Sequence, residues 1–189
     1  MRQRARQIDD TRNRIVAATV RLHETVGPAA TTVAGIAAEA GVTRLTVYRH
    51  FPEEDGLFYA CSEHWRARQT PPDPDAWAAA GELSQRLRVG FADVYRFYRG
   101  GQPMLAMIYR DLQLLPAPLR QSILAREDAW CDALVDGSRS RRLRAAVGHG
   151  LAFSTWQSLC VRQAMSDREA VAMMCEFVLA AGRPRRRPT

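Results

Sequence analysis

The chain of 189 residues contains no lysine, although 27 of its residues are basic. All of them are therefore arginines, which fits the codon usage of a GC-rich genome and excludes no function by itself. Against 20 acidic residues, the arginines leave a formal net charge of +7. A basic balance favours an acidic partner, although net charge alone does not distinguish a nucleic acid from a membrane surface.

Cysteine is also scarce, and the four cysteines lie far apart in the sequence. The chain has no Cys-x-x-Cys pair and no histidine at metal-ligand spacing, so we expect no metal site and no other cofactor. We expect the thiols to be reduced and buried, packing as small apolar side chains. They belong to Cys61, Cys131, Cys160 and Cys175.

Long apolar runs are absent. No stretch approaches the roughly 18 residues of a membrane span, and the first residues, MRQRARQIDD, lack the apolar stretch of a signal peptide. The composition, 47% hydrophobic and 25% charged, is that of a folded protein. We therefore expect a cytoplasmic protein that does not insert into a membrane.

Motifs for catalysis are missing as well. The Gly148-His149-Gly150 segment is only a fragment of a nucleotide-binding glycine pattern, and no predicted strand precedes it. The His23-Glu24 pair lacks the second histidine of a zinc-protease helix, and no Gly-x-Ser-x-Gly elbow occurs. The sequence predicts that the protein is not an enzyme, and a helical enzyme is the less favoured alternative.

The pattern that is present is helical nearly throughout. No segment alternates with period two for long enough to demand a strand, whereas apolar residues recur at helical spacing. We expect an all-α fold. The predicted helices cover about residues 10–26, 32–41, 43–51, 53–69, 76–98, 104–114, 119–135, 140–165 and 167–181.

The segment GVTRLTVYRHF, from Gly41 to Phe51, joins two of these helices. The glycine ends the first helix, and Val47 and Phe51 then share one face of the second. Two short helices joined by a tight turn and packed on a preceding helix predict a helix-turn-helix unit. The second helix of such a unit buries one face and presents the other to a groove of DNA.

The side chains on the open face all suit DNA. Arginine can contact guanine edges or phosphates, threonine can contact either, and leucine can contact a thymine methyl group. Tyr48, His50 and Thr32 are placed to donate hydrogen bonds to phosphates. The predicted DNA-binding residues are Thr32, Thr43, Arg44, Leu45, Thr46, Tyr48, Arg49 and His50.

Residues 31–58, TTVAGIAAEAGVTRLTVYRHFPEEDGLF, closely resemble the DNA-binding segment of the TetR family of bacterial transcriptional regulators. The resemblance implies an all-α homodimer that binds double-stranded DNA at a palindromic operator. It also implies a divergent C-terminal domain that dimerises and binds a small-molecule effector, most often to release a repressor. Two positions depart from the family pattern. Leu45 stands where the family usually has a small residue, and Glu54 stands where it often has a lysine.

Three parts follow from this interpretation. We expect a helix-turn-helix domain over residues 1–52 with a basic N-terminal arm, and a helical ligand-binding and dimerisation domain over residues 53–182. The clearest linker, TPPDPD, is too rich in proline to continue a helix. The arginine-rich residues 183–189 are expected to be a disordered tail.

The later part of the chain is rich in large apolar side chains. Each is by itself more typical of core packing, but together they predict a mostly apolar pocket for an apolar or aromatic effector. The predicted ligand-binding residues are Trp65, Phe91, Tyr95, Met107, Trp130, Phe153 and Trp156.

The last predicted helix is apolar on nearly all sides, and such a helix needs a second partner surface. The small residues of the preceding helix allow a close approach, so we expect these two helices to form a homodimer interface. The predicted interface residues are Val147, Gly150, Leu151, Ser154, Val171, Met174 and Val178. The alternative to a sequence-specific regulator is a non-specific architectural DNA-binding protein that binds through its arginine-rich ends.

Overall fold

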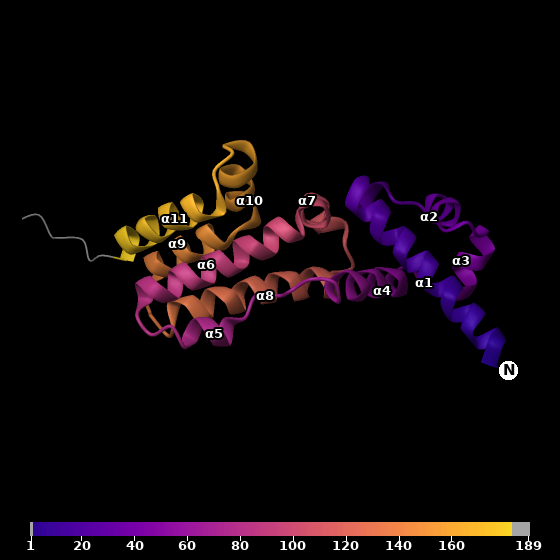
Figure 1. The fold of residues 1–189 in the computed structure, drawn as a ribbon, viewed down its shortest axis with the longest axis horizontal. Helices are drawn as coiled ribbons and strands as arrows, with labels where there is room; N and C mark the ends of the chain where they lie inside the picture. The colour runs from indigo at the N-terminus through magenta and orange to yellow at the C-terminus, as the bar shows by residue number, and fades with distance from the viewer. Residues whose placement is uncertain (1, 183–189) are drawn as a thin grey trace, which may run out of the picture. The chain divides into compact units, whose positions relative to one another are not determined.

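Residues 2–182 are described in the computed structural model, and helices are its only regular elements (Figure 1). The α-helices are α1 (Arg2–Thr25), α2 (Val33–Ala40), α3 (Arg44–His50), α4 (Glu54–Arg66), α5 (Pro74–Ala78), α6 (Leu83–Gly100), α7 (Gln102–Arg110), α8 (Ala117–Val135), α9 (Arg141–Leu151), α10 (Phe153–Trp156) and α11 (Asp167–Gly182). Short 3-10 turns lie at η1 (Pro28–Ala30) and η2 (Leu112–Leu114), and a π-helical segment lies at η3 (Gln157–Arg162). The all-α prediction is confirmed, and the predicted tail lies outside the described residues.

The helices form two compact units that interleave in the sequence. The first unit contains the residues up to 70 together with 101–120, and the second contains 71–100 together with the residues from 121 onward. The chain therefore passes between the units after residues 70, 100 and 120. The domain boundary expected at residue 52 stays a prediction, because it concerns where DNA binding ends rather than which residues pack together.

In the first unit, α1 packs against α2, α4 and α7. The apolar positions of α1 face inward and bury the inner faces of α2, α3 and α4. The buried side chains are Ile15, Val16, Ala18, Ile36, Ala37, Ala40, Val47, Phe51, Leu57 and Ala60. This core fixes α3 against α1 and leaves the other side of α3 outside the core.

Helix α1 begins at Arg2, earlier than the start expected near Asp10. None of its 24 residues is a glycine or a proline. The helix therefore continues from Asp10 back to Arg2 without a residue that would end it. The basic N-terminal segment expected as an arm is thus the first part of α1.

In the second unit, α6 packs against α5, α9, α10 and α11, and α9 packs against α11. Aromatic rings fill the space between α6 and the segment around α10. The Tyr98 ring lies edge-on to Phe153 at a centroid distance of 5.2 Å and also contacts Trp156 at 5.9 Å. The second unit therefore has its own apolar core.

The helix expected over residues 76–98 is divided into α5 and α6. Gly81, with φ of 73°, stands in the break. The Asp93 carboxylate on α6 accepts hydrogen bonds from the Asp73 N–H at 2.8 Å and from the Trp77 indole N–H at 2.9 Å. These bonds hold the short α5 against α6, and residues distant in sequence decide where the helix is interrupted.

The helix expected over residues 140–165 is also interrupted, because Ala152 adopts an extended conformation with ψ of 132°. The break leaves nearby carbonyl groups without helical partners. The Tyr95 hydroxyl donates to the Gly150 carbonyl at 2.9 Å, and the Tyr98 hydroxyl donates to the Leu151 carbonyl at 2.7 Å. Two buried tyrosines of α6 thus stabilise the break, which follows two residues after Gly150.

Candidate nucleic-acid interface

The turn between α2 and α3 depends on a glycine in the left-handed region. Gly41 has φ of 64° and ψ of 42°. Glycine adopts this conformation with little strain because it has no Cβ atom. Its N–H donates to the Ala38 carbonyl at 3.1 Å, and the Val42 N–H donates to the Ala37 carbonyl at 2.9 Å. This pair of bonds is the Schellman motif, which ends α2 and directs the chain into α3 within a few residues.

A threonine caps the N-terminus of each of the two helices. The Thr32 hydroxyl oxygen accepts from the Gly35 N–H at 3.1 Å, and the Thr43 hydroxyl oxygen accepts from the Thr46 N–H at 3.1 Å. The hydroxyl groups of Thr43 and Thr46 are also 2.9 Å apart. The caps fix where α2 and α3 begin, and the proposed DNA contacts of these threonines stay predictions.

Helix α3 has one buried and one open face. Val47 is 1% exposed, whereas Leu45 is 78% exposed and Tyr48 is 53% exposed. Arg44 and Arg49 are exposed as well, and Thr46 and His50 are half-buried. The structure therefore brings the predicted DNA-binding side chains of α3 together on a short helix whose opposite side is held by the core.

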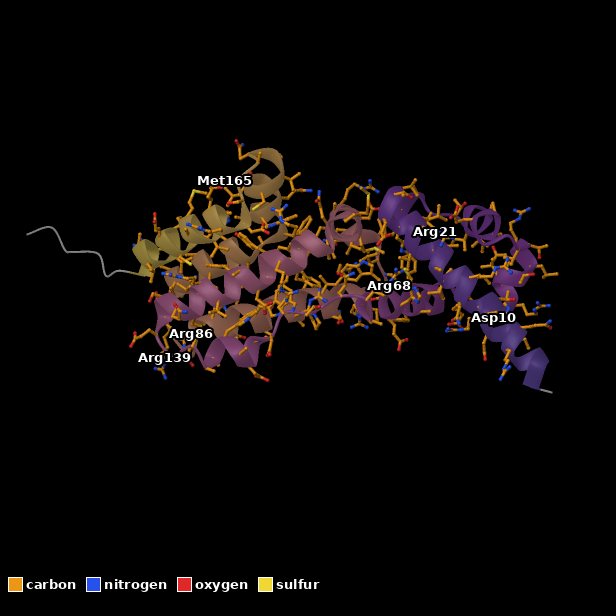
Figure 2. The ribbon with its side chains drawn as sticks, in the orientation of Figure 1. Asp10, Arg21, Arg68, Arg86, Arg139 and Met165 are labelled. Carbon is orange, nitrogen blue, oxygen red and sulfur yellow. The ribbon has the colours of Figure 1, made fainter. Side chains whose placement is uncertain are left out.

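The open face is free of acidic side chains from its own segment, because the chain has no Asp or Glu between Glu39 and Glu53. Glu39 is itself paired with Arg21 of α1, labelled in Figure 2, at 2.7 Å. The arginines of α3 thus meet no carboxylate from α3 or from the turn before it. Such a face attracts phosphate groups.

Two arginines of α1 support the helix-turn-helix and were not predicted from the sequence. The Arg14 guanidinium donates to the Ala40 carbonyl at 2.5 Å and to the Gly41 carbonyl at 3.1 Å. The Arg12 guanidinium lies 4.9 Å from the centre of the Phe51 ring. No local pattern could reveal these contacts, because the Arg14 bonds join residues 26 and 27 positions apart.

A second set of bonds holds the segment before α2 against the end of α7, also within the first unit. The Asp111 carboxylate accepts from the Ala29 N–H at 3.0 Å, and Arg110 donates to the Val26 carbonyl at 2.8 Å. The hydrogen bond from Arg110, with that from Ala29, holds the pKa of Asp111 below its usual value despite burial. Gly27, with φ of 88°, leaves room for both side chains.

The predicted ligand-binding residues are divided between the two units. Five of them, Phe91, Tyr95, Trp130, Phe153 and Trp156, are buried in the second unit, whereas Trp65 and Met107 belong to the first. Trp65 packs on Gly101, where an added Cβ would lie 2.7 Å from the indole ring. None of the seven lines the cavity beside α3, the cavity between α8 and α9, or the cavity between α6 and α11. Their role in ligand binding stays a prediction.

The predicted interface residues are mostly buried within the protomer itself. Ser154 is exposed, but Val147 and Val178 are 0% exposed, and the remaining four are also buried. The predicted set Val147, Gly150, Leu151, Val171, Met174 and Val178 therefore supports the packing of α9 and α11 with α6. The large apolar side chains that α11 leaves exposed are Met173 and Phe177.

Other kinds of site find no support within residues 2–182. There, no three histidine, cysteine or acidic side chains gather so that they could hold a metal ion. The four cysteines are buried and free, as predicted. In the same residues, every helix is too short or too polar to cross a membrane.

Comparison with known proteins gives one family match and several similar structures. The model for bacterial regulatory proteins of the tetR family matches residues 15–61, which run from the later part of α1 into α4. A TetR-like transcriptional regulator from Rhodococcus sp. RHA1 has a similar structure, with a TM-score of 0.64 and 17% sequence identity over 92% of this chain and 97% of that one. A Rhodococcus sp. protein assigned to the TetR family of transcriptional regulators aligns with a TM-score of 0.56 and 17% identity over 90% and 98% of the two chains. A search of curated protein sequences found no match.

Proposed function

We propose that this chain is a DNA-binding transcription regulator of the TetR type, and that it is a repressor that a small apolar or aromatic effector releases from its operator. The observation that carries the proposal is the geometry of α3. Its buried face is fixed by Val47, and its exposed face presents two arginines with no acidic residue nearby in the sequence. A helix held in this way can enter a major groove while the rest of the unit stays outside the duplex.

We propose that Arg44 and Arg49 read base edges, whereas Thr32, Tyr48 and His50 contact phosphates. An arginine can make two hydrogen bonds to one guanine, and loss of such a pair costs about 1 to 3 kcal/mol of discrimination. Leu45, the most exposed large apolar side chain of α3, is suited to a thymine methyl group. Loss of a phosphate contact instead weakens binding to every duplex alike.

We further propose that a homodimer binds a palindromic operator, because two α3 helices must enter successive major grooves about 34 Å apart. Met173 and Phe177 of α11 are the exposed apolar side chains that suit the contact with a second copy. Phe177 also lies against the His149 ring at a centroid distance of 5.9 Å. His149 of α9 and Phe177 of α11 therefore form one aromatic surface that spans both helices.

Selection from a pool of random DNA duplexes tests the proposal. A sequence-specific regulator should enrich a palindrome, which a footprint on the enriched duplex should then show as one protected site. Arg49→Ala should weaken binding to the enriched duplex by about tenfold or more, equivalent to 1.4 kcal/mol, and should weaken binding to random duplexes far less. Arg139→Ala, an exposed arginine of the second unit labelled in Figure 2, serves as the matched control.

The second candidate is a non-specific DNA-binding protein, which the net charge of +7 favours. Such a protein would enrich no sequence, and Arg49→Ala would weaken binding to enriched and random duplexes equally. Either result would contradict the proposed reading of bases by α3.

Release by an effector follows thermodynamic linkage. A ligand that moves the protein from 99% to 1% of the DNA-binding state must prefer the other state by about 5.5 kcal/mol. Operator DNA must then weaken binding of the ligand by the same factor. A ligand that binds the free protein and the DNA complex equally well is not the inducer.

A further inference from the structure

A cavity of about 260 Å³ lies inside the first unit, directly behind α3. It is formed by side chains of α1, η1, α2, α3 and α4 and of the segments that join them. They are Thr19, His23, Pro28, Thr31, Val33, Ile36, Val47, Tyr48, Phe51, Pro52, Leu57 and Phe58. The lining contains no acidic residue and no arginine, and its histidine is considered below.

The cavity has a buried floor and an accessible mouth. Thr19, Ile36 and Val47 are at most 4% exposed, whereas Tyr48 and Pro52 are exposed. An apolar cavity of about 150 Å³ in another protein holds one benzene molecule. A space of 260 Å³ is thus suited to a molecule of about two fused rings.

The polar groups of the lining are neutral. The Thr19 hydroxyl donates to the Ile15 carbonyl at 2.9 Å, and the Thr31 hydroxyl donates to the Gly27 carbonyl at 2.8 Å. Their oxygens keep lone pairs that can accept a further hydrogen bond. Burial lowers the pKa of His23 to about 4, partly opposed by the charge of Asp111, so the ring is neutral at pH 7. An ionised ligand would lose its hydration here without gaining an opposite charge.

We propose that this cavity is a binding site for a small uncharged aromatic molecule of about two fused rings with one hydrogen-bond donor, and that its occupation opposes DNA binding. The site differs from the effector pocket expected among the aromatic residues of the later helices, because its lining belongs wholly to the first unit. The effect on DNA rests on the proposed function, whereas the site itself does not.

Coupling to DNA follows from residues shared by the two faces of α3. Tyr48 lines the mouth of the cavity and is also a proposed phosphate contact. Val47 and Phe51 line its inner part and are the side chains that hold α3 on the core. A ligand that contacts all three favours the position of α3 that leaves most room behind the helix, whereas DNA favours the position that fits the groove. Each therefore weakens the other.

Indole is a suitable probe, because it has two fused rings, no charge and one N–H donor. We expect the full-length protein to bind indole in a calorimetric titration and to show nuclear Overhauser effects between the indole protons and the methyl groups of Ile36 and Val47. This experiment uses the unaltered protein and depends on no variant. Absence of binding, or contacts only to methyl groups elsewhere, would overturn the proposed site.

A matched pair of substitutions tests the location. Val33 and Val42 are both half-buried against the same core, but only Val33 lines the cavity. Val33→Phe should fill part of the space and weaken indole binding about tenfold or more, whereas Val42→Phe should leave it within about twofold. Circular dichroism establishes that both variants are folded. Equal losses in the two variants would place the indole elsewhere, and if Val33→Phe does not fold, the contacts in the unaltered protein decide.

Binding to the enriched duplex separates the two parts of the proposal. Saturating indole should lower the affinity for that duplex, and the duplex should lower the affinity for indole by the same factor. If saturating indole leaves the duplex affinity unchanged, the proposed coupling is wrong, whereas the proposed binding site still stands. If no duplex is enriched, the proposed function fails, but the titration and the methyl contacts still decide whether the site exists.

Discussion

His23 is a histidine that folding removes almost entirely from water, with only 3% of its surface exposed. Its Nδ1 atom lies 3.4 Å from the Cys61 sulfur, and its ring packs beside Phe58 at a centroid distance of 5.4 Å. Burial also raises the pKa of the Cys61 thiol to about 12, so both partners are neutral at pH 7. Protonation of this imidazole would place a charge in the core without a carboxylate in direct contact.

Stability should therefore fall between pH 6.5 and about pH 4 because of His23. The pKa of His23 is lower in the folded chain, about 4, than its ordinary value of 6.5. The unfolded chain therefore binds the proton more readily, and lowering the pH from 6.5 to about 4 favours unfolding. Above pH 6.5 the neutral ring makes its full contribution to the free energy of unfolding. From pH 7.5 to pH 5 we expect a loss of about 2 kcal/mol in the free energy of unfolding.

Urea unfolding at the two pH values measures this loss. His23→Gln should remove most of the difference attributable to the group, whereas the exposed His149→Gln should retain it. The same pH dependence in His23→Gln and in the unaltered protein would contradict the assignment.

At the scale of single elements, the junction between α1 and η1 depends on Gly27. This residue has φ of 88° and ψ of 164°, a region that only glycine occupies readily. An added Cβ atom would lie 2.2 Å from the Arg110 guanidinium and 2.7 Å from the Asp111 carboxylate. The attachment of α7 to the segment before α2 therefore requires the absence of a side chain at this position.

Gly27→Ala should lower the free energy of unfolding by about 2 kcal/mol or more, because backbone strain and the displaced Arg110 and Asp111 side chains act together. Gly148→Ala is the matched control, since Gly148 lies within α9 and an added Cβ would meet nothing within 4 Å. That substitution should stabilise the protein by about 0.5 to 1 kcal/mol. Thermal or urea unfolding measures both, and equal effects would show that the junction tolerates a side chain.

At the scale of the whole molecule, the burial of α11 distinguishes folding from assembly. Val178 is 0% exposed, so Val178→Arg should place an unpaired charge in the core of the protomer and prevent stable folding. Phe177, its neighbour in the sequence, is 46% exposed. Phe177→Glu should therefore give a folded protein that fails to dimerise, if α11 is the interface proposed above.

Sedimentation measures the mass, and circular dichroism measures the helical content of both variants. A Phe177→Glu dimer as stable as the unaltered protein would move the interface away from this face of α11. A folded Val178→Arg protein would contradict the placement of Val178 in the core.

The sequence by itself determined the all-α class and the helix-turn-helix, because the signals for both are local. The glycine that ends α2, the two capping threonines and the spacing of Val47 and Phe51 act within a few residues of one another. Such local signals can be recognised without knowledge of the rest of the fold. The family model matches this same part of the chain. The four free cysteines also followed from composition and spacing alone.

Only the tertiary structure decided which side chains share a core, a cavity or a surface. The bonds from Tyr95 and Tyr98 that stabilise the break at Ala152 join residues 55 and 53 positions apart. The return of residues 101–120 to the first unit likewise depends on contacts between distant segments. For the same reason the sequence does not reveal that Val178 is buried within the protomer, and its place at an interface stays a prediction. Helical periodicity identifies an apolar face, but the partner that covers the face is set by packing across the whole chain.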